Sequence, residues 1–124
     1  MASHFVCIVD DDDSVRAALD GLVRSLGHVT DTFASAREFL GAQRTRPYDC
    51  VILDVQMPDL DGLQVQQQLL TEARCPPLIF VTGHPKPGWR DRAMAAGALA
   101  FLAKPYECAT LVALIEQACR MGLG

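Results

Sequence analysis

Five short runs of strand-forming residues recur along this chain, each separated from the next by room for one helix. They lie at residues 5–9, 29–33, 50–54, 78–82 and 99–103. Apolar runs of this length predict strands buried on both faces, which is typical of a parallel sheet covered by helices. Regular alternation of such strands with helices predicts an α/β fold with five strands and five helices.

The segments between the strands carry apolar residues at helical spacing. The clearest is Val15–Leu26, with Asp13 or Ser14 as its expected N-cap. The second helix is expected to start at the capping-box sequence Ser35–Glu38. The remaining helices are expected at about residues 63–73, with Leu70 on the buried face, 89–96 and 108–121.

Length and composition exclude several classes of protein. The 124 residues show no linker or repeat, so we expect a single domain over residues 1–124 with no output domain in this chain. A net charge of −4 gives no basic surface for nucleic acid or an anionic membrane. No apolar run is long enough to span a membrane and no signal peptide is apparent, so we expect a cytoplasmic protein.

The cysteines and histidines show no recognisable pattern of ligands. Five cysteines are an odd number without a C-x-x-C pair, and we interpret them as reduced thiols rather than as disulfides or a zinc site. The three histidines lie far apart in the sequence and form no metal motif.

Polar residues follow four of the expected strands. Asp10 and Asp11 follow the first, Asp54 and Thr82 end the third and fourth, and Lys104 follows the fifth. Ligands of open parallel sheets bind beyond the carboxyl ends of the strands, where the strand order reverses. The three carboxylates would repel one another unless they shared a proton or bound a cation, and carboxylate oxygens suit Mg²⁺. We therefore expect a Mg²⁺ site at this edge. Asp12 and Asp13 are interpreted as a solvated acidic turn at a helix start.

These residues carry a resemblance to a known family. Asp10–Asp11, Asp54, Met57–Pro58, Thr82–Gly83 and Lys104–Pro105 resemble the signature of the response-regulator receiver domain, the phosphoacceptor switch of two-component signalling. The resemblance covers essentially the whole chain and is similar in detail to receivers that precede a helix-turn-helix domain in some transcription regulators. It implies a flavodoxin-like, doubly wound sheet with strand order 2-1-3-4-5.

The resemblance also implies a reaction and its ligands. Asp54 would accept a phosphoryl group from a phosphohistidine on a histidine kinase or a phosphotransfer protein. Mg²⁺ would be held by Asp10, Asp11, Asp54 and the backbone carbonyl of Gln56, and Lys104 would draw charge from the phosphoryl oxygens. In the family the peptide bond before the proline, here Pro105, is commonly cis.

Two further residues would transmit the change. The family implies that the Thr82 hydroxyl bonds the new phosphoryl group and that the aromatic Phe101 turns inward; a plain strand threonine and a core phenylalanine are the alternatives. The expected output surface is the face of the fourth helix, fifth strand and fifth helix, which would bind a downstream partner or a second copy. Trp89, near that face, is either a packing anchor or part of a partner surface.

Gln56 and His84 each lie two residues beyond a site residue. The family implies that such side chains flank the phosphoryl group and tune its hydrolysis; alternatively, both point to solvent.

Three other functions remain open from the sequence. A Mg²⁺-dependent phosphohydrolase of the haloacid-dehalogenase type would have a second Asp two residues after the nucleophile, where this chain has Gln56. A flavodoxin-like FMN carrier would have a hydroxyl- and Gly-rich loop after its first strand, where this chain has four aspartates. A receiver that serves only as a non-phosphorylated scaffold is less consistent with the complete set of site residues.

Overall fold

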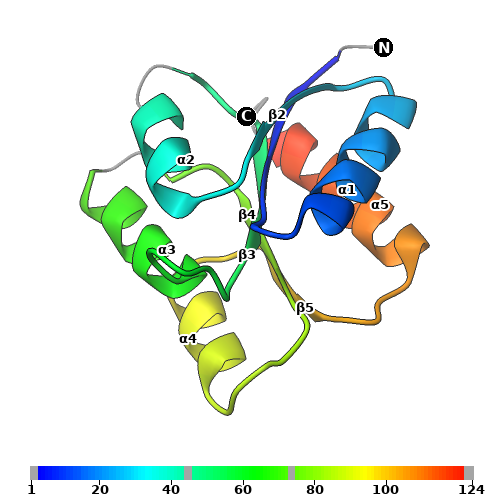
Figure 1. Ribbon diagram of the computed structural model, residues 1–124. Coiled ribbons are helices and arrows are strands. Elements are labelled where there is room, and N and C mark those ends of the chain that lie inside the picture. The colour runs from blue at the N-terminus through cyan, green and yellow to red at the C-terminus, as the bar shows by residue number, and fades with distance from the viewer. Residues whose placement is uncertain (1–2, 44–45, 73–74, 122–124) are drawn as a thin grey trace.

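A computed structural model describes residues 3–43, 46–72 and 75–121. Its five strands form one parallel sheet in the order β2-β1-β3-β4-β5 (Figure 1). The strands are β1 (Phe5–Val9), β2 (Val29–Phe33), β3 (Cys50–Asp54), β4 (Leu78–Thr82) and β5 (Ala100–Ala103). Four of the five predicted strands have the expected bounds, and the fifth begins one residue later than expected. The predicted fold class and strand order are confirmed.

Five helices cover the two faces of the sheet. They are α1 (Asp13–Ser25), α2 (Ala36–Gln43), α3 (Gly62–Thr71), α4 (Trp89–Ala95) and α5 (Cys108–Met121). Figure 1 shows α1 and α5 on one face and α2, α3 and α4 on the other. None of the helices in the described residues is long and apolar enough to cross a membrane.

Alternate residues of the central strands feed two separate cores. On β3, Val51 and Leu53 pack with the α2–α4 side, whereas Cys50 and Ile52 pack with α1 and α5. Strands β3 and β4 are buried along their whole length. Because β2 is an edge strand, none of its residues is buried: three are half-buried, Thr32 is exposed, and Val29 is 58% exposed. The continuous apolar runs of β3 and β4 therefore reflect burial on both faces, as expected for inner strands of a parallel sheet.

Two helix details differ from the sequence expectation. The N-cap of α1 is Asp12 rather than the expected Asp13 or Ser14. Its carboxylate accepts hydrogen bonds from the backbone N–H groups of Ser14 and Val15, and the helix begins at Asp13. On α3, Val65 is buried and Leu70 is 42% exposed, because Leu70 lies at the margin of the stripe that faces the sheet.

Two residues cap the N-terminus of α2: the predicted Ser35 and also Asp59. The Ser35 hydroxyl accepts from the Glu38 backbone N–H at 3.2 Å. Asp59, from the loop after β3, accepts from the N–H groups of Ala36 and Arg37 at 3.4 and 3.0 Å. This carboxylate at a helix N-terminus ties α2 to the loop that follows Asp54.

Candidate functional site

Two buried carboxylates meet at the carboxyl edge of the sheet. Strands β1 and β3 are neighbours with Val9 opposite Leu53, so Asp10 and Asp54 leave the sheet side by side. Asp10 is 1% exposed and Asp54 is 7% exposed, whereas Asp11 is exposed to solvent. One ligand oxygen from each of the three lies within 4.8 Å of the other two. The structure thus brings together the three carboxylates that the sequence placed at one edge.

Each buried carboxylate is only partly satisfied by hydrogen bonds. Asp10 Oδ1 accepts from the Asp12 backbone N–H at 2.9 Å, and Asp54 Oδ1 accepts from the Gln56 backbone N–H at 3.1 Å. Asp10 Oδ2 is buried without a hydrogen-bond partner among the described residues and lies 3.8 Å from Lys104 Nζ. A buried carboxylate oxygen without a donor is costly, so this arrangement favours a bound cation.

Burial and mutual repulsion change the protonation of this pair. Burial, with the nearby Asp10 charge adding to it, raises the pKa of Asp54 to about 6. Burial also raises the pKa of Asp10, and the hydrogen bond from the Asp12 N–H and the attraction of Lys104 only partly offset this rise. The ion pair of Asp10 and Lys104 is long, so burial is the larger effect. The site is therefore short of positive charge when all its carboxylates are ionised.

Thr82 and Lys104 approach the carboxylates from β4 and β5. Thr82 is fully buried at the end of β4, and its hydroxyl accepts from the His84 backbone N–H at 3.4 Å. The Lys104 backbone N–H donates to the Thr82 carbonyl at 2.8 Å. The peptide bond between Lys104 and Pro105 is cis, as the resemblance implied. The two strand ends are thus joined directly through the main chain.

Phe101 points into the core on the α2–α4 side of the sheet. It is 6% exposed and packs against Phe80, with ring centroids 6.2 Å apart. Phe80 and Thr82 are two residues apart on β4 and so share a face of the sheet. Phe101 and Thr82 consequently lie on the same side, an arrangement that fits both a core residue and a switch residue.

Gln56 and His84 are held through their backbones rather than their side chains. Both side chains are exposed, while their N–H groups bond Asp54 and Thr82 as described above. The two residues therefore lie at the rim of the site, and a role of their side chains in hydrolysis stays a prediction.

Gly62 is a site residue that the sequence reasoning missed. It is the first residue of α3, and a Cβ there would lie 2.8 Å from the Asp54 carbonyl oxygen and 3.0 Å from the Val55 Cα. Its N–H donates to the Val55 carbonyl at 2.8 Å. Only glycine allows α3 to pack this closely on the backbone of Asp54. Its position directly after the N-cap residue Asp61, where a helix former would be ordinary, was the available signal.

Comparison with known proteins shows which family has this arrangement. Residues 6–116 match the family described as the response regulator receiver domain. The chain belongs to this family. The receiver is 39% identical over 116 residues to the response regulator protein TodT of Pseudomonas putida strain F1, covering 94% of this chain and 51% of TodT.

Two further proteins extend the comparison. The transcriptional regulatory protein FixJ of Bradyrhizobium diazoefficiens is 36% identical over 115 residues, covering 93% of this chain and 56% of FixJ. The solved structure of the response regulator StyR superposes with a TM-score of 0.87 at 40% identity, covering 97% of the receiver and 61% of that chain. The receiver thus spans about half the length of the curated relatives it matches.

Proposed function

We propose that this receiver is the phosphoacceptor switch of a two-component system and that Asp54 takes the phosphoryl group. The observation that supports this most is the buried pair of Asp10 and Asp54, in which the partnerless Asp10 Oδ2 faces Lys104 Nζ at 3.8 Å. Asp54 Oδ1 accepts the Gln56 backbone N–H, which leaves Oδ2 available as the nucleophile.

The acidic cluster fits a Mg²⁺ ion. Asp10, Asp11, Asp54 and the backbone carbonyl of Gln56 would hold it, and the exposed Asp11 leaves room for the waters that Mg²⁺ retains. The bound ion would neutralise charge on the carboxylates and on the phosphoryl oxygens. The raised pKa of Asp54 and the partnerless oxygen of Asp10 are the features of this structure that such an ion would relieve.

The proposed transfer needs three side chains of this chain. A free oxygen of Asp54 attacks the phosphorus of a phosphohistidine on a histidine kinase or phosphotransfer protein, the new O–P bond forms, and the P–N bond breaks. The departing imidazole keeps the electron pair and takes a proton from solvent. Lys104 moves its ammonium from Asp10 to a phosphoryl oxygen, and the Thr82 hydroxyl donates to another.

The proposed output follows from the position of Thr82. When the Thr82 hydroxyl turns toward the phosphoryl group, its hydrogen bond from the His84 N–H breaks. The move would leave space on the side of the sheet where Phe101 packs. We propose that this changes the face formed by α4, β5 and α5, which binds a downstream partner or a second copy. By likeness to FixJ, which is named as a transcriptional regulator, the change would serve transcription. A cytoplasmic location stays a prediction.

Trp89 can report this change. It is half-buried at the start of α4, packs against the α2–α4 core, and has Lys86 Nζ 5.4 Å from its ring centroid. Its fluorescence should shift when beryllofluoride, a phosphoryl mimic, saturates the site. A Trp89 signal and a self-association state that both stay constant on saturation would exclude this face as the output.

Intact mass measurement tests the acceptor. With acetyl phosphate and Mg²⁺, the wild type should gain one phosphoryl group, and Asp54→Asn should gain none. Asp91→Asn, which removes an exposed carboxylate from α4, is the matched control and should be phosphorylated normally. Full phosphorylation of Asp54→Asn would refute the assignment, and a wild type that takes up no phosphate would favour the scaffold function.

A further inference from the structure

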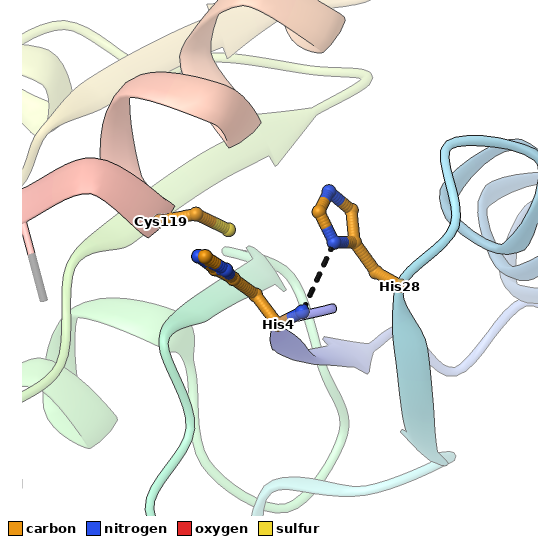
Figure 2. A group of neighbouring side chains, drawn as sticks. All are labelled: His4, His28 and Cys119. Atoms are coloured by element: carbon orange, nitrogen blue, oxygen red, sulfur yellow. Dashed lines mark hydrogen bonds between the residues drawn. The ribbon is translucent and has the colours of Figure 1, made fainter. Parts of the chain in front are cut away.

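Two of the three histidines and one cysteine come together at the amino edge of the sheet. Figure 2 shows His4, just before β1, His28, just before β2, and Cys119, near the end of α5. One ligand atom from each lies within 4.8 Å of the other two. The sequence shows no metal motif here because the three residues are brought together only by the pairing of β1 with β2 and by the packing of α5.

The His4 imidazole is in an unusual environment. Both ring nitrogens are buried, and neither has a hydrogen-bond partner among the described residues. A neutral imidazole has one N–H donor and one lone pair, so this ring leaves both unsatisfied. Buried polar atoms are normally paired, and an exception calls for a ligand or a functional reason. A metal ion would occupy the lone pair of His4.

The backbone around His4 is fixed in advance. Its N–H donates to His28 Nδ1 at 3.2 Å, as the dashed line in Figure 2 shows, and its carbonyl accepts from the Val29 N–H at 2.9 Å. The two rings meet edge to face, with centroids 5.6 Å apart and planes at 70°. Ligand atoms around tetrahedral zinc lie about 3.3–3.7 Å apart, so the three ligand atoms, now within 4.8 Å of one another, would have to move closer to bind one ion.

We propose that His4, His28 and Cys119 bind one Zn²⁺ ion at a site separate from the acidic site. Two imidazoles and a thiolate are ligands for borderline and soft metals, whereas the carboxylates of the acidic site suit Mg²⁺. Three protein ligands leave the fourth position of the zinc to water or to an added ligand. Asp10 lies six positions after His4 along β1, so the two sites are about 20 Å apart.

The charges around the three ligands favour a cation. The carboxylates of Asp49 and Glu116 act on both Cys119 and His28. The Cys119 thiol would release its proton to solvent as the S–Zn bond forms.

Binding has a structural cost and a structural consequence. His28 Nδ1 accepts the His4 N–H, so zinc at either ring nitrogen breaks that hydrogen bond: at Nδ1 the metal takes the lone pair, and at Nε2 the ring proton has to move to Nδ1. In return, zinc would link the start of β1 and β2 to the end of α5. Zinc should therefore raise the melting temperature of the receiver, because it binds only the folded arrangement.

Co²⁺ is a spectroscopic probe for this site. The wild type is titrated with Co²⁺ under reducing conditions with Mg²⁺ in excess, so that the acidic site is saturated. One equivalent should produce a thiolate-to-cobalt charge-transfer band with the strong visible bands of tetrahedral cobalt, and Zn²⁺ should remove both. Cys119→Ser should abolish the charge-transfer band, and His28→Asn should weaken Zn²⁺ binding at least about tenfold.

Matched controls separate this site from other thiols and histidines. Cys108→Ser and His84→Asn change exposed residues elsewhere and should leave the cobalt spectrum and the zinc-induced rise in melting temperature unchanged. Asp54→Asn should also bind Co²⁺ normally, so a failure of the proposed phosphorylation would not affect this result. If Cys119→Ser proves unfolded by circular dichroism, His28→Asn, at a half-buried position, decides the question.

The opposite results would overturn the proposal. Four results would show that the three residues form only a packing contact. The wild-type spectrum could lack the thiolate-to-cobalt band, or the band could persist in Cys119→Ser or be lost in Cys108→Ser. Zinc binding could also be unchanged in a folded His28→Asn.

Discussion

The raised pKa of Asp54 makes a quantitative prediction about folding. A carboxyl group whose pKa is higher in the folded state binds its proton more tightly there, so ionisation opposes folding. This penalty is absent below the unfolded pKa of 3.8 and complete above the folded pKa of about 6. Each tenfold change in proton affinity is about 1.4 kcal/mol, so the penalty is about 3 kcal/mol at neutral pH.

Asp54→Asn removes this penalty and should stabilise the metal-free receiver. The variant should unfold with a free energy about 2–3 kcal/mol higher than wild type near pH 7.5, and the gain should shrink to about 1 kcal/mol near pH 4.5. Urea unfolding in the presence of a chelator, at both pH values, measures the difference. Asp91→Asn, on the surface of α4, should show no comparable gain at either pH.

Addition of Mg²⁺ extends the same experiment. The ion should stabilise wild type more than Asp54→Asn, since the variant has lost one ionised ligand. A variant that is less stable than wild type at neutral pH, or a difference that does not change with pH, would refute the conclusion that burial and repulsion dominate at Asp54.

Further predictions concern the metal, the lifetime of the phosphoryl group and the packing around the acceptor. Asp11→Asn should weaken Mg²⁺ binding and slow phosphorylation without unfolding the domain; unchanged affinity in a titration would contradict its role as a ligand. Gln56→Ala and His84→Ala should each change the decay rate of phospho-receiver several-fold, and decay equal to wild type would place their side chains outside the mechanism. Gly62→Ala should cost about 1–3 kcal/mol of stability in urea unfolding, whereas Gly41→Ala, which meets no atom within 4 Å, should not.

Features local to one strand were predictable from the sequence. Apolar runs bounded β3 and β4 correctly because both strands are buried on both faces, and the polar residues at their ends mark the edge where the runs stop. That Asp10 lies beside Asp54 depends on β1 and β3 being neighbours. Sequence pattern does not determine strand order, and the prediction of this order rested on the family resemblance.

Features that depend on contacts between elements were missed. The meeting of His4, His28 and Cys119 requires two strands in register and a helix running back along the sheet, none of which is encoded by residue spacing. The role of Gly62 depends on how closely α3 approaches the backbone of Asp54. Both are consequences of packing, which a pattern along one segment does not specify.

The close approach of α3 makes the two sides of the phosphoacceptor site mechanically unequal. The main chain at Asp54 and Val55 is clamped against Gly62, where even one added carbon would collide. Beside Thr82, by contrast, the nearest atom to a Cβ built on Gly83 is Lys104 Cδ at 4.0 Å. A movement of the acceptor loop toward α3 would meet the backbone contact at Gly62, whereas the surroundings of Gly83 leave space on the side of β4 and β5. We therefore expect phosphorylation to move the main chain on the side of β4 and β5 more than at the junction with α3.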